Sequence, residues 1–89
     1  MTSFDARICR ICGYLFSGWS PWGEDGQSPT FDFCPCCGVE FGYQDSSLAG
    51  VRRWRDRWLR DGAQWSDSYV ESDGLEADAR MSRVPEEFR

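Results

Sequence analysis

The sequence contains no histidine and no lysine, so all ten of its basic side chains are arginines. Histidine is the most common general base in enzymes and the most common nitrogen ligand of metal ions. A glycine-rich loop of the kind that cradles phosphate groups is also missing. Because the sequence offers no recognisable catalytic constellation, we expect that the protein is not an enzyme.

Long apolar segments are missing as well. Residues 1–7 lack the hydrophobic stretch of a secretory signal, and no run approaches the length of a membrane span. The number of cysteines, five, is odd and therefore fits a disulfide framework poorly. We expect a soluble, cytoplasmic protein with reduced cysteines that does not bind membranes.

Four of the cysteines form two Cys-x-x-Cys-Gly knuckles, which are separated by residues 14–33. Two thiolates three residues apart can point at one ion, and the following glycine lets the chain turn beneath it. A chain of 89 residues buries little core, so a metal ion would add needed stability. The predicted ligands of this metal site are Cys9, Cys12, Cys34 and Cys37.

The identity of the metal and the role of Cys36 stay open at this stage. Cys34 and Cys36 could form an alternative ligand pair, although one intervening residue would break the match with the first knuckle. Four sulfurs suit one zinc ion per chain, which we favour, and a single iron is geometrically possible. Cys36 is either a small buried side chain or a reactive thiol, and the second role would need electropositive surroundings.

The remaining pattern predicts a small, metal-stabilised α+β fold: a four-cysteine zinc ribbon with rubredoxin-like knuckles and short antiparallel strands, plus one amphipathic helix. The strands are expected at residues 14–16, 30–33 and 39–43, where apolar or aromatic residues flank the knuckles. A glycine- and proline-rich loop over residues 17–29 separates the first two strands.

The amphipathic helix is expected at residues 47–61, with Gly62 ending it and Trp65 folding back over its last turn. Its apolar face, expected to pack onto the ribbon, consists of Leu48, Val51, Trp54 and Trp58. The ribbon and this helix form a predicted domain at 1–65. Residues 66–89 form an acidic tail, partly disordered or with a short helix after a capping-box pattern at residues 73–76.

The charge alternates along the chain, with net values of -4, +3 and -4 for residues 1–45, 46–62 and 63–89. The central basic segment could bind nucleic acid. Aspartates four residues from arginines on the same helix favour solvated or internally paired arginines instead, with pairs between Asp56 and Arg52 or Arg60, and between Asp61 and Arg57. Arg55 projects into the apolar face, where it could stack on a tryptophan.

Two resemblances to known families follow from these residues. Cys9-x-x-Cys-Gly-Tyr14 and Cys34-Pro-x-Cys-Gly38 resemble the metal-binding loops of rubredoxin, which implies iron and electron transfer. Cys34-Pro-Cys-Cys-Gly38, residues 40–45 and the segment 57–65 resemble small bacterial zinc-ribbon proteins of the cysteine-rich CPCC type. This second resemblance implies a fold and a zinc ion, and suggests an accessory protein, some relatives being encoded beside bacterial toxins.

Our hypothesis from the sequence is a zinc-binding module for protein–protein interaction. Its metal is structural, because a closed four-cysteine site has no open position for water. Trp19 and Trp22, on the loop between the knuckles, either contact the partner together with the acidic surface or cover the metal site. The partner could be a toxin that an immunity-type protein neutralises. An iron electron carrier and a nucleic-acid-binding ribbon are the alternatives.

Overall fold

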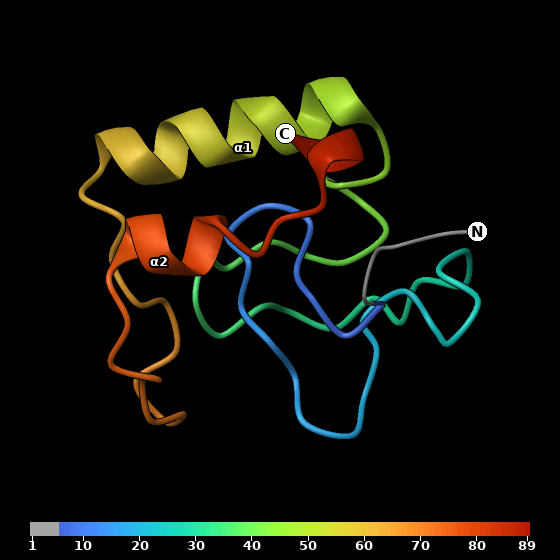
Figure 1. Ribbon diagram of the computed structural model, residues 1–89, viewed down its shortest axis with the longest axis horizontal. Helices are drawn as coiled ribbons and strands as arrows, with labels where there is room; N and C mark the ends of the chain where they lie inside the picture. Colours follow the sequence, from blue (N-terminus) through green and yellow to red (C-terminus); the bar gives the residue numbers. More distant parts are fainter. Residues whose placement is uncertain (1–5) are drawn as a thin grey trace.

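The computed structural model describes residues 6–89. Its regular elements are helical: α1 spans Leu48–Arg60, α2 spans Ala77–Met81, and a short 3-10 helix, η1, spans Glu86–Phe88. The α1 helix lies along one side of the molecule, next to α2, the C-terminal turn and the loops that carry the cysteines (Figure 1). In this part of the chain no helix has the length and apolar character needed to cross a membrane.

Local sequence signals explain where α1 begins and ends. The Ser47 hydroxyl accepts a hydrogen bond from the Gly50 amide at 3.0 Å, which satisfies one of the free amides of the first turn. After the helix, Gly62 adopts φ 97°, a left-handed conformation that costs glycine little. The helix predicted at 47–61 is therefore confirmed to within one residue at each end.

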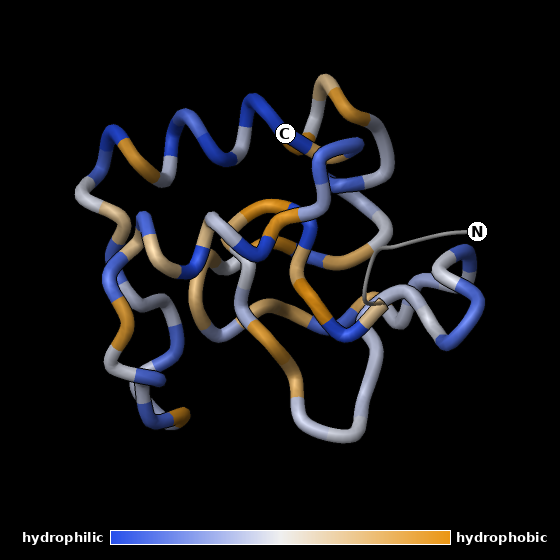
Figure 2. The backbone as a smooth tube through the Cα atoms, in the orientation of Figure 1, coloured by the Kyte–Doolittle hydropathy of each residue, from blue (hydrophilic) through white to orange (hydrophobic). Residues whose placement is uncertain are grey.

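The inward face of α1 packs on the cysteine-bearing loops. Val51 and Trp58 are buried, and Trp54 packs partly buried against the same core. Leu48 is 40% exposed, so this predicted core residue lies at the surface. Colouring by hydropathy shows apolar stretches along the central loops, while much of α1 is hydrophilic (Figure 2).

The predicted antiparallel strands are missing from residues 6–89, so the prediction of a zinc ribbon with an α+β fold is wrong. Each knuckle is closed by a single isolated antiparallel bridge, Ile8 with Leu15 and Phe33 with Glu40. A ladder needs several successive residue pairs, and here the chain turns away after one pair. The result is two knuckle loops and two helices rather than a ribbon.

Backbone conformation explains why the bridges do not extend into strands. Phe31 adopts φ 61°, in the left-handed region, within the predicted strand 30–33. Gly42 adopts φ 98° within the predicted strand 39–43, and Gly18 turns the chain at φ 66° soon after residues 14–16. Alternation of apolar and polar residues did not reveal these turns.

The two knuckles are structural repeats, one over residues 7–16 and the other over residues 32–41. In the first, the Cys9 amide donates to the Tyr14 carbonyl and the Phe16 amide to the Arg7 carbonyl, both at 2.9 Å. The equivalent bonds of the second repeat, Cys34 to Val39 and Phe41 to Asp32, are also 2.9 Å. The Phe16 and Phe41 rings meet edge to face, with centroids 5.7 Å apart, so the repeats share one core.

The segment after α1 is hydrogen-bonded to the second knuckle. The amides of Ser66 and Asp67 donate to the Pro35 carbonyl at 3.0 and 2.9 Å, and the Ser66 amide also reaches the Cys36 carbonyl. Asp73 does not cap α2, whose N-cap is Glu76 without a side-chain hydrogen bond. The division of the chain into a domain at 1–65 and a tail at 66–89 stays a prediction.

Candidate metal centre

The knuckles bring the four predicted ligands together. Their sulfur atoms all lie within 4.8 Å of one another, and each of these side chains is buried. The Cys9 and Cys37 sulfurs are 3.8 Å apart, and those of Cys12 and Cys34 are 3.7 Å apart. Each close pair joins one cysteine of the first knuckle to one of the second, so a single ion between them would tie both loops together.

Turn geometry positions these sulfurs. In each knuckle the glycine amide donates to the carbonyl of the first cysteine, at 3.1 Å from Gly13 to Cys9 and 2.9 Å from Gly38 to Cys34. Both glycines adopt left-handed backbone conformations, with φ 82° and φ 79°. This turn aims two side chains three residues apart at one point, as the knuckle spacing predicted.

Two of the six distances between the sulfur atoms can be compared with those around a tetrahedral metal ion. With metal–sulfur bonds of about 2.3 Å, the edge of a regular tetrahedron is about 3.8 Å. The two close sulfur pairs match this value. Four thiolates suit zinc or a single iron, and the geometry does not distinguish between them. The site is therefore compatible with a structural metal, and the assignment of the individual ligands stays a prediction.

Burial opposes ionisation of most of these thiols. It raises the pKa of Cys12 and Cys37 well above the ordinary value of a thiol, and it also raises the pKa of Cys34. Burial acts in the same direction on Cys9, but hydrogen bonds from the three neighbouring sulfurs lower its pKa overall. Four buried thiolates would need a nearby positive charge, which a divalent ion could supply.

Arg55 is a buried cation beside the first knuckle. Its side chain, on α1, is 8% exposed and donates hydrogen bonds to three backbone carbonyls: Ile11 and Arg10 at 2.8 Å and Phe88 at 2.7 Å. Burial lowers the pKa of Arg55, and the charge of Cys9 counteracts this. Arg55 does not stack on a tryptophan as predicted, because carbonyls surround its guanidinium.

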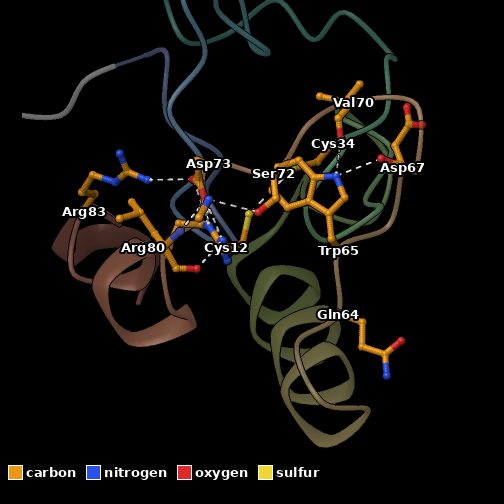
Figure 3. A network of polar contacts seen from close by, with 12 residues as sticks. Cys12, Cys34, Gln64, Trp65, Asp67, Val70, Ser72, Asp73, Arg80 and Arg83 are labelled. Carbon is orange, nitrogen blue, oxygen red and sulfur yellow. Dashed lines mark hydrogen bonds and ion pairs between the residues drawn. The ribbon is translucent and has the colours of Figure 1, made fainter.

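A second buried cation, Arg80, lies beside the cluster on α2. It forms an ion pair with Asp73 at 2.7 Å and donates to the Leu75 carbonyl. Figure 3 shows Asp73 and Arg80 gathered next to Cys12. The hydrogen bond from Arg80 lowers the pKa of Asp73, and the same hydrogen bond, together with the negative charges of Cys36, Asp73 and Cys12, raises the pKa of Arg80. Sequence analysis missed this arrangement because Cys12 lies far from Asp73 and Arg80 in the chain.

Trp22 belongs to a partly buried network with Asp45 and Arg10. Its indole N–H donates to Asp45 at 2.8 Å, and the Arg10 guanidinium lies 3.9 Å from its ring centroid. Burial raises the pKa of Asp45 against the effect of this hydrogen bond. Trp19 is 36% exposed and packs edge to face on Phe16, with centroids 4.7 Å apart. Trp22 therefore packs inward, and Trp19 keeps part of its surface free.

Cys36 is buried but is not part of the four-sulfur cluster. A hydrogen bond with Cys12 and the charge of Arg80 lower its pKa, and burial raises it. Cys36 therefore has the electropositive neighbour that a reactive thiol needs, but it is also buried, as a structural cysteine is.

The arginines of α1 do not form the predicted pairs. Between residues 6 and 89 the ion pairs within 4.0 Å join Asp73 to Arg80 and Arg83, and none involves α1. Arg52 instead donates to the Arg89 carbonyl at 2.9 Å, and Arg57 lies 5.8 Å from the Trp54 ring centroid. The arginines on the outward surface of α1 therefore lack, in the described part of the chain, the neighbouring carboxylates that internal pairing would have given them.

The fold and site define a small cysteine-rich protein with a four-sulfur cluster. Two proteins of Bacillus subtilis (strain 168), both described as uncharacterised, are similar to it. YozI is 36% identical over 61% of this chain and 57% of its own length. YoaQ is 34% identical over 61% of this chain and 58% of its own. The chain thus spans less than two thirds of each relative.

No family model and no solved structure matches the chain. The resemblance to zinc-ribbon proteins of the CPCC type therefore rests on the quoted motifs and on a cysteine cluster compatible with such a site.

Proposed function

We propose that this protein is a scaffold held together by a structural zinc ion and that it binds a partner protein. The observation that supports this proposal most directly is a set of exposed aromatic side chains around a closed cysteine cluster. Their exposed fractions are 58% for Phe31, 65% for Phe33, 68% for Tyr43 and 98% for Tyr69. Aromatic residues are enriched in protein interfaces and contribute much of their binding energy.

Two of these rings share one surface. Phe33 and Tyr69 line a cleft of about 340 Å³ together with Gly38 and residues 66–68. The Ser66 hydroxyl lies 2.8 Å from where a Gly38 Cβ would stand, so the segment carrying Tyr69 fits closely against the second knuckle. We call Phe33 and Tyr69 the aromatic pair. The knuckle holds one ring and supports the segment that holds the other.

The backbone at Phe31 supports the same interpretation. A phenylalanine at φ 61° costs roughly 1–2 kcal/mol relative to an ordinary conformation. Strained residues of this kind are concentrated at functional sites. Here the strained backbone holds the side chain of Phe31 at the surface, two residues before Phe33 of the aromatic pair.

The proposal assigns no catalytic role to the metal. Four protein ligands would fill a tetrahedral ion and leave no position for water or substrate. Metal analysis of anaerobically purified protein tests the choice of zinc, since zinc–thiolate protein is colourless and iron–thiolate protein is coloured. One zinc per chain is the expected result. Coloured protein with one iron would overturn this part of the proposal and favour the electron carrier.

Comparative affinity capture tests the partner. We expect wild-type protein to retain a specific protein that the double variant Phe33→Ser, Tyr69→Ser does not retain. Leu59→Ser is the matched control, because Leu59 is 39% exposed on α1, outside the aromatic pair. Equal capture by all three proteins, or by none, would contradict the proposal. Identification of the captured protein also tests whether the partner is a toxin.

A further inference from the structure

A cleft lies between α1 and the turn that precedes this helix. Its volume is about 440 Å³, within the range of roughly 300–1,000 Å³ typical of small-molecule sites. The lining includes Tyr43, Gln44, Gly50, Arg53, Trp54 and Arg57. None of the lining residues is acidic, in a chain with a net charge of -5.

Two arginines supply the charge of this cleft. Arg53 and Arg57 are one helical turn apart on α1, which places their side chains on the same face. Among the described residues, neither forms an ion pair within 4.0 Å. Two guanidiniums without acidic partners can each make charge-assisted hydrogen bonds to one doubly charged anion. A phosphate monoester matches both, whereas a single carboxylate neutralises only one.

Two aromatic rings supply flat surfaces beside this charge. The indole N–H of Trp54 donates to the Cys37 carbonyl at 3.0 Å, which fixes the ring against the second knuckle. Tyr43, from the turn before α1, is 68% exposed and lines the same cleft. The cleft therefore combines a fixed indole, an exposed phenol ring and two arginines.

The turn also brings a polar side chain into the cleft. The Gln44 side-chain oxygen accepts a hydrogen bond from the Glu40 amide at 3.0 Å, which leaves its NH₂ group to donate. A Cβ at Gly50 would lie 2.3 Å from the Gln44 carbonyl oxygen, so the turn packs closely on the helix here. These contacts hold the cleft in shape without a ligand.

We propose that this cleft binds a small ligand that carries a phosphate group on a planar ring system, the chemistry of a mononucleotide. The phosphate pairs with Arg53 and Arg57, and the ring packs against Tyr43 and Trp54. The net charge of -5 opposes a long polyanion such as RNA. A small ligand instead experiences mainly the charges within a Debye length, about 8 Å at physiological salt.

This site is distinct from the proposed partner surface. The aromatic pair lies on the second knuckle and residues 66–69, while the cleft is lined by α1 and by Tyr43, Gln44 and Ser47. The two proposals can therefore fail separately.

Titration calorimetry with full-length, metal-loaded protein tests the proposal, with adenosine monophosphate, inorganic phosphate and adenosine as probes. We expect saturable binding of adenosine monophosphate with 1:1 stoichiometry, weaker binding of phosphate that competes with it, and the weakest binding of adenosine. Arg53→Ala and Arg57→Ala should each weaken nucleotide binding roughly tenfold or more, as expected for a lost charged hydrogen bond.

Two further variants make the experiment specific. Arg60→Ala removes the same charge from an exposed position of α1 that does not line the cleft, and should leave nucleotide affinity unchanged. Tyr43→Ala should weaken binding of the nucleotide but not of phosphate. Metal content and helical circular dichroism establish that each variant is folded.

Three results would overturn the proposal. The first is a lack of saturable binding of both the nucleotide and phosphate. The second is an equal loss of affinity in Arg60→Ala and Arg53→Ala, which would indicate general attraction to the basic helix. The third is tighter binding of a single-stranded oligonucleotide than of the mononucleotide, which would point to nucleic acid.

Discussion

A glycine substitution in the first knuckle tests how the C-terminal segment is attached to the cysteine cluster. A Cβ added at Gly13 would lie 1.9 Å from the Arg80 carbonyl oxygen, so α2 packs directly against the backbone of the knuckle. Gly18, at φ 66°, offers a matched control, because a Cβ there would meet nothing within 4 Å. Gly13→Ala and Gly18→Ala share the conformational penalty, and only Gly13→Ala adds a clash.

The two costs can be separated. An alanine in the left-handed region costs roughly 1–2 kcal/mol, partly offset by a gain of about 0.4–1 kcal/mol from the less flexible unfolded chain. Gly18→Ala should therefore lower the free energy of unfolding by about 1 kcal/mol. Gly13→Ala must also displace a backbone carbonyl, and overpacking of this kind costs typically about 1–3 kcal/mol more.

Urea denaturation of the metal-loaded protein, followed by tryptophan fluorescence, measures both variants. Tryptic cleavage provides a local readout, since trypsin cuts after arginine and Arg80 is 4% exposed in the docked helix. We expect faster cleavage at Arg80 in Gly13→Ala than in Gly18→Ala under conditions where both variants are folded. Equal stability and equal cleavage would refute the docking of α2 on the first knuckle.

Three further predictions concern the metal centre and its surroundings. Cys37→Ser should lose the metal and unfold, whereas Cys36→Ser should keep its metal; equal loss in metal analysis would overturn the ligand assignment. Arg55→Met should destabilise the protein by about 3 kcal/mol in urea denaturation, because three buried carbonyls lose their donor; an unchanged midpoint would contradict this. The hydrogen bond from Arg80 lowers the pKa of Asp73 in the folded protein. The Asp73 carboxylate therefore stabilises the fold at pH values above the pKa that Asp73 has in the unfolded chain. This contribution is lost as the pH falls through the pKa of Asp73 in the folded protein. Asp73→Asn should thus be less stable than wild type at pH 7, with a difference that shrinks below about pH 4; a constant difference down to about pH 3 would contradict the ion pair.

Short-range patterns predicted the local structure well. The spacing of Cys9 and Cys12 predicted a turn with converging thiols, and the hydroxyl of Ser47 marked the start of α1. Both depend on residues within one turn of each other, so the sequence alone contains the necessary information. The same sequence also contains the pattern Cys-x-x-Cys-Gly-x-x-Phe twice, at 9–16 and 34–41, which would have placed Phe16 and Phe41 in the core.

Strands and long-range contacts were harder to predict. The alternation of apolar and polar residues around Phe33 is compatible with a strand. The positive φ at Phe31 interrupts the extended conformation that a strand needs, and a phenylalanine in the sequence does not indicate such a φ. The ion pair of Arg80 with Asp73 lies beside Cys12, which comes from the opposite end of the chain. Such contacts depend on tertiary packing, which overrides local preference.

The placement of the buried arginines links the metal centre to both proposed binding surfaces. Four thiolates around a divalent ion carry a net charge of about -2. Arg55 from α1 and Arg80 from α2 lie beside this cluster, so each helix contributes one buried cation that the charged site stabilises. The second knuckle in turn accepts hydrogen bonds from Trp54 in the cleft and from Ser66 in the segment leading to Tyr69. A scaffold built this way would need its metal to keep both surfaces in shape.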